Sequence, residues 1–247
     1  RRVLTVPEGA AIGTHLRMLM AILRRYDLAV STQPGDRPTF YAWAAGKRAV
    51  GPVEASAGGF WKRWLLSRWI AFDNRDTHTV VMNLRLAELF GIERKFDVVV
   101  SWRPSDESRV SSMLAFDPAS EPYAVFHPFP KFNYKMWNET NWIELAQTLR
   151  TRGLHVLLTG GPDAAEVACC ARIAGACGAT SLAGQLSLGQ TGTLLRQASL
   201  FVGPDTAVTH IAAATGIPTV ALFGPTNPVK WGPWPADWST LESPWQR

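Results

Sequence analysis

Hydrophobic and polar positions alternate in regular blocks over the second half of the chain. Short apolar runs predict strands at residues 123–128, 154–161, 199–203 and 218–224. Apolar residues at helical spacing predict helices over residues 138–153, 163–177, 188–198 and 206–216. Strands that alternate with helices in this way predict a parallel sheet covered by helices on both faces.

The first half of the chain shows the same strand–helix pattern less clearly. The pattern predicts strands at residues 27–33 and 96–102 and helices over residues 39–46 and 79–92. Two prolines and small polar residues at 116–122 then suggest a linker. We therefore expect two α/β domains that face a cleft, residues 1–119 and residues 120–247.

Composition places the chain among globular proteins with enough apolar material for a core. It has 247 residues, of which 47% are hydrophobic, and a formal net charge of +5. It contains no run of eighteen apolar residues and neither end resembles a signal peptide, so the sequence predicts no membrane-spanning helix. The start, RRVLTVPE, and the end, LESPWQR, suggest a fragment. The positive charge suits an acidic partner, and it does not distinguish nucleotides, sugar phosphates, anionic membranes and nucleic acids from one another.

The cysteines give no sign of a metal or redox site. Cys169 and Cys170 are adjacent, and their spacing to Cys177 matches no zinc-binding pattern. We expect buried or free thiols and no metal.

The most informative stretch is FVGPDTAVTHIAAATGIPTVALFGPTNP, residues 201–228. Gly203 lets the backbone turn after a strand, and Asp205 or Thr206 can cap the helix that follows. The amides of residues 206–208 would then be unpaired at the positive end of the helix dipole, with His210 one turn further along. This arrangement predicts an anion site, whereas the alternative is a capped helix with a histidine satisfied in the core.

Two further loops favour the anion site. TGGP at residues 159–162 also ends a strand in glycines before a helix, and HPFPKFNYKMW at residues 127–137 carries Lys131 and Lys135 after another strand. In open α/β sheets such loops gather at one edge. Three of them, rich in Gly, Lys, Thr and His, indicate a phosphorylated ligand.

These same segments carry a family resemblance. HPFPKFNYKMWNETNWIELAQTLRTRGLHVLLTGGP, LAGQLSL and DTAVTHIAAATGIPTVALFGPTNP resemble the C-terminal half of glycosyltransferase family 9, the ADP-heptose:lipopolysaccharide heptosyltransferases. The likeness covers roughly residues 120–235, and RRYDLAVSTQPGDRPTFYAWAAGKRAVG and HTVVMNLRLAELFGI resemble the first half more weakly. The resemblance implies the GT-B fold, which has two Rossmann-like domains and an active site between them.

The resemblance also implies roles for individual residues. Lys135 would contact the phosphates of the nucleotide sugar, and Asp205, Thr206 and His210 would bind the pyrophosphate and the sugar hydroxyls. The family usually has Gly after the Asp-Ser/Thr pair, where this chain has Ala207, so a methyl group would crowd a close backbone–phosphate contact.

The loop formed by Thr159, Gly160 and Gly161 would lie by the nucleotide. The implied reaction moves a heptose, with inversion, from ADP-heptose to the lipopolysaccharide inner core. Because the chain has no Asp-x-Asp, we expect a helix end and cations, rather than a metal, to stabilise the leaving diphosphate. No cofactor is expected besides the nucleotide-sugar donor.

The catalytic base is harder to place. In the family it is an Asp in a loop near the start of the N-terminal domain, and we expect that residue to precede Arg1. Within the chain, Asp36, in QPGDRP after a predicted strand, is the best substitute, although an ordinary turn aspartate is the alternative. Arg37 beside it either meets an acidic acceptor or is simply solvated.

Aromatic and basic residues alternate in GGFWKRWLLSRWI, residues 58–70. As a helix this segment would place Trp61 and Trp64 on one side, which suits a membrane interface or a glycolipid such as the lipid A–core acceptor. The alternative is a buried helix. We expect a cytoplasmic protein in peripheral contact with the inner face of the bacterial inner membrane.

Two other functions stay open. A GT-B-fold epimerase or phosphorylase would need further acid–base residues, and a non-catalytic nucleotide-sugar-binding module would need none. Nucleic-acid binding is not expected because no basic-aromatic binding motif accompanies the charge.

Overall fold

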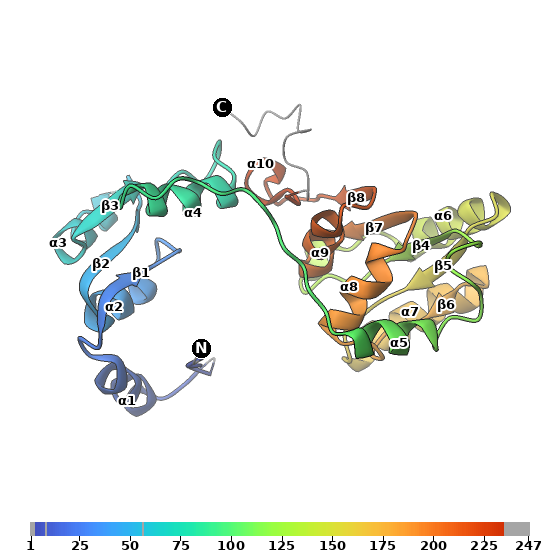
Figure 1. The fold of residues 1–247 in the computed structure, drawn as a ribbon, viewed down its shortest axis with the longest axis horizontal. Coiled ribbons are helices and arrows are strands. Elements are labelled where there is room, and N and C mark those ends of the chain that lie inside the picture. Colours follow the sequence, from blue (N-terminus) through green and yellow to red (C-terminus); the bar gives the residue numbers. More distant parts are fainter. Residues whose placement is uncertain (1–2, 8, 56, 235–247) are drawn as a thin grey trace. The chain divides into compact units, whose positions relative to one another are not determined.

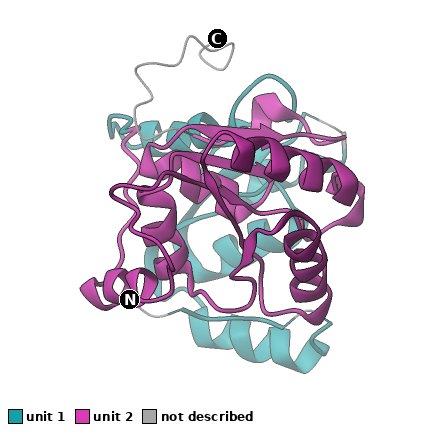
Figure 2. Cartoon of the chain, turned by 90° about the vertical axis from the view of Figure 1, so that its right-hand side faces the viewer, with its two compact units in different colours: residues 1–95, 247 teal, residues 96–246 magenta. Residues whose placement is uncertain are grey.

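The computed structural model describes residues 3–7, 9–55 and 57–234. The chain divides into two compact units, residues 1–95 and residues 96–246, coloured separately in Figure 2. The boundary expected between residues 119 and 120 lies within the second unit, and each unit is described by itself below.

The first unit is built on a small parallel sheet. Its elements are α1 (Ile12–Ile22), β1 (Tyr26–Val30), α2 (Asp36–Ala45), β2 (Gly46–Val53), η1 (Ala57–Gly59), α3 (Lys62–Leu65), β3 (Arg68–Ala71) and α4 (Thr79–Glu88). The strands lie in the order β1-β2-β3, all parallel. The predicted strand at 27–33 and helices over 39–46 and 79–92 are confirmed as β1, α2 and α4, with shifted ends.

The helix expected over residues 58–70 is wrong. Only Lys62–Leu65 is α-helical, and the chain then enters β3, in which Trp69 pairs with Gly51 of β2. Trp69 and Ile70 of this segment therefore complete the sheet, because β2 pairs with them.

The strand expected at residues 96–102 is also wrong, since no ladder forms there. Val99 is exposed, whereas Val100 and Trp102 approach the backbone at Gly192: a methyl group added to that glycine would lie 3.4 Å from Val100 and 3.2 Å from Trp102. The alternation thus reflects an extended segment that lies against a helix rather than a strand.

The second unit contains a five-stranded parallel sheet. Its elements are α5 (Pro104–Ser111), β4 (Tyr123–Phe126), η2 (Asn133–Lys135), α6 (Glu139–Thr151), β5 (His155–Leu158), α7 (Ala164–Cys177), β6 (Thr180–Ser181), α8 (Leu188–Arg196), β7 (Leu200–Pro204), α9 (Ala207–Thr215), β8 (Thr219–Leu222) and α10 (Pro228–Trp231). The strands lie in the order β6-β5-β4-β7-β8, all parallel. Every strand and helix predicted over residues 123–224 is confirmed, and β6 was not predicted.

This strand order places a topological switch between β4 and β7. From β4 the chain moves outward through β5 to β6, then returns to pair β7 on the other side of β4. The crossovers on the two sides of β4 run in opposite directions, so the loops after β4 and β7 diverge and leave a crevice at the carboxyl edge. That edge is where a ligand site is expected.

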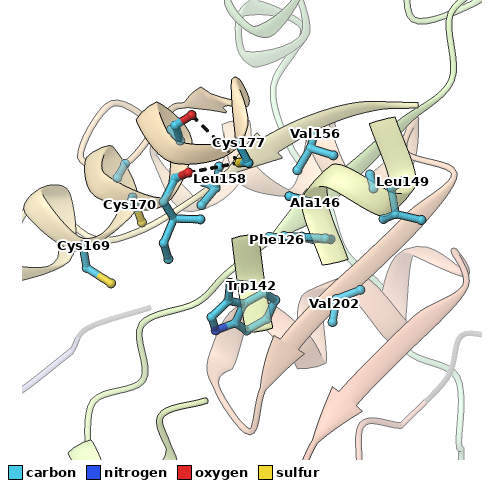
Figure 3. Packing of buried hydrophobic residues seen from close by; sticks show 14 residues of the cluster. Phe126, Trp142, Ala146, Leu149, Val156, Leu158, Cys169, Cys170, Cys177 and Val202 are labelled. Carbon is cyan, nitrogen blue, oxygen red and sulfur yellow. Dashed lines mark hydrogen bonds between the residues drawn. The ribbon is translucent and has the colours of Figure 1, made fainter. Parts of the chain in front are cut away.

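Helices cover both faces of this sheet (Figure 1). On one face α6 and α7 pack against alternate strand residues, and Figure 3 shows Trp142 beside Phe126, with ring centroids 5.2 Å apart. On the other face α5, α8 and α9 pack against the intervening positions, such as Tyr123 and Phe201. Because the central strands β4, β5 and β7 are covered on both sides, their short apolar runs are continuous in the sequence rather than alternating with polar residues.

The three cysteines belong to α7 and are buried free thiols, as predicted. Burial raises the pKa of Cys169 to about 11 and that of Cys170 to about 12, so both stay protonated near neutral pH. They serve as small apolar side chains in the core shown in Figure 3.

Among the described residues, no helix has the length and apolar character needed to cross a bilayer.

Candidate functional site

A pocket of about 1120 Å³ opens at the switch point of the second unit. Its walls come from the loops after β4, β5 and β7, the N-terminus of α9, and parts of α8 and α10. Eight predicted binding residues line it, namely Lys135, Thr159, Gly160, Gly161, Asp205, Thr206, Ala207 and His210. The expectation that three separate loops meet at one sheet edge is therefore confirmed in geometry.

Asp205 stands at the centre of the charged groups. The ammonium of Lys135 donates to its Oδ2 at 2.6 Å and to its main-chain carbonyl at 3.4 Å. Nε2 of His210 lies 3.7 Å from Oδ1 of the same carboxylate. The side chains of Lys135 and Asp205 are only 13% and 10% exposed, so this ion pair is largely shielded from solvent.

His210 is less buried, with 42% of its side chain exposed. Burial lowers the pKa of His210, and the attraction of the Asp205 carboxylate opposes that shift. The imidazole is therefore mainly neutral at pH 7 and can donate one hydrogen bond or accept one.

The N-terminus of α9 has free amides. Thr206 is the N-cap residue, but its side chain makes no capping bond, and its hydroxyl lies 3.3 Å from that of Thr209. Thr209 in turn donates to the carbonyl of Pro204. Within the described part of the chain, no acceptor pairs with the amides of Ala207 and Val208. The capping predicted for Asp205 or Thr206 is thus not formed, and the amides stay available to an anion.

The turn before α9 is tight. A methyl group added at Gly203 would lie 2.6 Å and 2.8 Å from ring carbons of Phe201 and 3.2 Å from the hydroxyl of Thr209. Glycine at this position lets the backbone pass between the two side chains and delivers Asp205 to the pocket. Ala207 is exposed at the pocket wall, so its methyl group faces the space that a ligand would occupy.

The loop after β5 is closed by a carboxylate. The amide of Gly161 donates to Oε2 of Glu166 at 2.5 Å, so this amide is not free for a phosphate. Glu166 itself lines the pocket and can accept hydrogen bonds from ligand hydroxyls.

His127 was not predicted as a site residue. It follows β4 directly, lines the pocket and is 7% exposed. Its Nδ1 lies 3.1 Å from the hydroxyl of Thr159, and burial lowers the pKa of His127 to about 4. The signal was present in the sequence, since a polar residue directly after a buried strand lies at the carboxyl edge of the sheet.

The candidates in the first unit lie elsewhere, beside a second pocket of about 400 Å³ lined in part by Asp36, Arg37 and Trp61. Asp36 begins α2, and its Oδ1 lies 2.8 Å from the ammonium of Lys62, which is 4% exposed. Trp64 is 84% exposed.

The base of the family was expected to precede Arg1. Arg1 itself lies outside the described residues, which start at Val3, so the structure contains no group with which to compare that expectation. It stays a prediction, and Asp36 is the candidate base that the structure places beside a pocket.

Among the described residues, no group of three or more His, Cys, Asp or Glu side chains could hold a metal ion.

The geometry agrees with the comparisons to known proteins. The sequence model of glycosyltransferase family 9 (heptosyltransferase) matches residues 15–244. The chain belongs to this family. The resemblance inferred from the pocket loops is therefore confirmed.

Several members of glycosyltransferase family 9 are similar in sequence. The chain is 35% identical over 162 residues to lipopolysaccharide heptosyltransferase 3 of Escherichia coli K12, a match that covers 64% of this chain and 47% of that protein. It is 32% identical over 251 residues to lipooligosaccharide heptosyltransferase 2 of Haemophilus influenzae, which covers 92% of this chain and 70% of the relative. The chain thus spans about half the length of several curated relatives that it matches.

Solved family 9 structures share the fold. A glycosyltransferase from Veillonella parvula matches with a TM-score of 0.71 at 18% identity, over 91% of this chain and 65% of that one. ADP-heptose LPS heptosyltransferase II of E. coli matches with a TM-score of 0.67 at 22% identity, over 90% and 69% of the two chains. The α/β GT-B fold class with parallel sheets is confirmed.

Proposed function

We propose that this protein is a heptosyltransferase that moves a heptose from ADP-heptose to the inner core of lipopolysaccharide, with inversion and without a metal ion. Membership of family 9 supports heptosyl transfer. The observation that carries the assignment is the pocket at the β4–β7 switch, where Lys135, His210 and the free amides at the start of α9 meet.

The pocket suits the leaving group of this reaction. In the transfer an acceptor hydroxyl oxygen bonds to the anomeric carbon of the heptose, the bond from that carbon to the diphosphate oxygen breaks, and a base takes the hydroxyl proton. Negative charge then grows on the diphosphate. An ammonium group has three protons to donate, so Lys135 can contact a phosphate oxygen while it keeps its bond to Asp205. The amides of Ala207 and Val208 add dipoles that are already oriented.

We assign the donor to the second unit and the acceptor to the first, with the boundary between residues 95 and 96 rather than between residues 119 and 120 as expected from the sequence. Asp36 stays the predicted base within the chain, and its carboxylate contacts the ammonium of Lys62 at 2.8 Å. Arg37, which makes no ion pair among the described residues, is free to meet an acidic acceptor.

Thermal shift with ADP and UDP tests the donor site. ADP should raise the melting temperature of the wild-type chain more than UDP does. The shift should fall strongly in Lys135→Ala and His210→Ala, and should persist in Lys47→Ala, which removes an exposed lysine of the first unit. Equal ADP-induced shifts in all four proteins would contradict the assignment.

A non-catalytic nucleotide-sugar-binding module is the second candidate, favoured by the engagement of Asp36 with Lys62. Incubation of the chain with ADP-heptose and a deacylated lipopolysaccharide acceptor separates the two. Transfer requires release of one ADP for each heptose joined to the acceptor, whereas a binding module would bind ADP-heptose and leave it intact.

We further propose that the protein works at the inner face of the bacterial inner membrane, in peripheral contact with it. Support comes from Phe60 and Trp64, which are 62% and 84% exposed, and from Arg63, whose guanidinium lies 4.4 Å from the ring centroid of Trp69. In flotation with anionic vesicles, the Trp61→Ala/Trp64→Ala variant should stay at the bottom of the gradient, apart from the floating vesicles. Val99→Ala, which changes an exposed residue of the second unit, should float like the wild type. Equal flotation of all three proteins would remove the proposal.

A further inference from the structure

His127 has a fixed position at the switch point. Its backbone amide donates to the carbonyl of Val202 at 3.0 Å, so the ladder between β4 and β7 extends through it. The side chain is 7% exposed and lines the pocket. A buried imidazole is costly unless its polar atoms find partners, so the partners of its two nitrogens reveal its role.

The network around Nδ1 favours one tautomer. Nδ1 lies 3.1 Å from Oγ1 of Thr159, and that oxygen lies 3.2 Å from the carbonyl of Phe126. A hydroxyl has a single proton. When Thr159 donates it to Phe126, Oγ1 accepts a second bond from Nδ1–H and both contacts are hydrogen bonds. With the proton on Nε2 instead, Thr159 would donate to Nδ1 and its contact with Phe126 would carry no proton.

The other ring nitrogen is open to the pocket. No described residue forms a hydrogen bond with Nε2, and the side chain of His127 lines the pocket, whereas the indole Nε1 of Trp142 is buried and unpaired. Burial also keeps the ring neutral, because it lowers the pKa of His127 to about 4. A neutral imidazole protonated on Nδ1 presents a lone pair at Nε2. That lone pair repels phosphate oxygens and accepts an O–H or N–H proton.

We propose that His127 is a specificity-determining residue that accepts, through Nε2, one hydrogen bond from a hydroxyl or amino group of the nucleoside. The assignment rests on the proposed function, in which the pocket holds a nucleoside diphosphate sugar. The lone pair at Nε2 indicates the nucleoside, whose hydroxyl and amino groups carry protons, rather than the diphosphate, whose oxygens carry none. The diphosphate belongs with Lys135 and the start of α9, which are positively polarised.

Two substitutions separate this role from a structural one. His127→Asn keeps a donor at the position of Nδ1 for Thr159 and removes the acceptor at Nε2. His127→Gln places its amide near the position of Nε2 and loses the contact with Thr159. Calorimetric titration with ADP, 2′-deoxy-ADP, 3′-deoxy-ADP and inosine diphosphate then identifies the donor group, because each analogue lacks one candidate proton source.

We expect His127→Asn to bind ADP about 2- to 10-fold more weakly than the wild type, as the loss of one neutral hydrogen bond implies. His127→Gln should recover part of that loss. The analogue that lacks the contacting group should bind the wild type as weakly as ADP binds His127→Asn. Its affinity for His127→Asn should be no lower than its affinity for the wild type. Unchanged ADP affinity in His127→Asn, or the same loss with all four nucleotides, would overturn the assignment.

Nitrogen-15 NMR of the imidazole tests the tautomer in the wild-type chain, without depending on a variant that folds. We expect the proton on Nδ1 in the free protein and a shift of the Nε2 resonance when ADP is added. A proton on Nε2 in the free protein would overturn this assignment and leave the proposed function intact. A wild-type chain that binds none of the four nucleotides would overturn the proposed function and this assignment with it.

Discussion

Replacement of Asp205 by Asn tests the central ion pair of the pocket. The substitution removes the negative charge that faces the ammonium of Lys135 at 2.6 Å and leaves it with neutral acceptors, the new amide oxygen and the main-chain carbonyl at 3.4 Å. Lys135 is 13% exposed, so solvent replaces little of what is lost. Removing one partner of a fully buried pair costs about 3–5 kcal/mol, and we expect about 3 kcal/mol here because the lysine borders the open pocket.

A double-mutant cycle isolates the pair. Lys135→Met should also destabilise the second unit, since it leaves the Asp205 carboxylate beside the mainly neutral imidazole of His210, 3.7 Å away. The double variant has no unpaired buried charge, so it should be more stable than the sum of the two losses predicts, by about 1–3 kcal/mol. The exposed pair Lys47–Asp27, whose side chains are 66% and 92% exposed, provides the control and should show no measurable coupling.

Hydrogen exchange measured on peptides that cover β7 and α9 is the suitable assay, because it reports the stability of the second unit apart from the first. Losses that add within about 0.5 kcal/mol in the double variant would refute the reasoning. They would show that Lys135 and Asp205 are each solvated well enough to stand alone, despite their short contact.

Three further predictions concern stability, each measured by denaturant unfolding of the second unit. Gly203→Ala should cost about 1–3 kcal/mol, because the new methyl group would lie 2.6 Å from the ring of Phe201, and an unchanged midpoint would show that the turn can relax. Trp142→Ala should cost about 3–5 kcal/mol, since this side chain is 1% exposed in the core, whereas a loss below about 1 kcal/mol would mean that the core collapses around the gap. Acidification should destabilise the fold through His127, whose pKa falls from 6.5 to about 4 on folding. As the pH falls, the unfolded chain takes up the proton at a higher pH than the folded chain does. The contribution of the neutral imidazole to the free energy of unfolding is therefore complete above pH 6.5 and is lost as the pH falls from there through 4. It amounts to about 3 kcal/mol. The free energy of unfolding of His127→Asn should change correspondingly less between about pH 7.5 and about pH 4.5 than that of the wild type. The same change in both proteins would contradict the low pKa of His127.

The second unit could be predicted from the sequence because each of its strands and helices is determined locally. Runs such as residues 199–203 are short, apolar and bounded by turn residues, and helix ends carry their own signals, as in the left-handed Gly216 after α9, with φ of 84°. The parallel order of the strands then follows from the alternation itself.

The errors arose where a partner distant in sequence decides the structure. Residues 96–102 have the alternation of a strand, yet no neighbouring strand lies beside them and their inward side chains meet α8 instead. Residues 68–71 have helical spacing in part, yet β2 offers them a ladder. Periodicity reports which side of a segment is buried, and it does not report what buries it.

The site was predictable in membership but not in its internal contacts. Lys135 and Asp205 are seventy positions apart, and only the switch-point topology brings their loops together. That both would line one pocket followed from the sheet edge, whereas the bond between them depends on side-chain geometry. The place of His127 at the sheet edge could likewise be predicted from its position after a buried strand, whereas its bond to Thr159 depends on the register between β4 and β5.

A carboxylate at the centre of an anion site has a thermodynamic consequence. Without Asp205, Lys135 would be an isolated, shielded cation, and any phosphate would bind tightly to it in substrate and product alike. With Asp205 in place, the ammonium is already neutralised, so a resting diphosphate gains less from it. In the proposed transfer, the additional negative charge that develops on the diphosphate as the sugar bond breaks still gains from the ammonium and from the oriented amides of α9. Interactions that strengthen only during the reaction raise its rate, whereas uniformly tight binding does not. The pair is therefore better suited to a site that must release its nucleoside diphosphate after each turnover than to one that stores it.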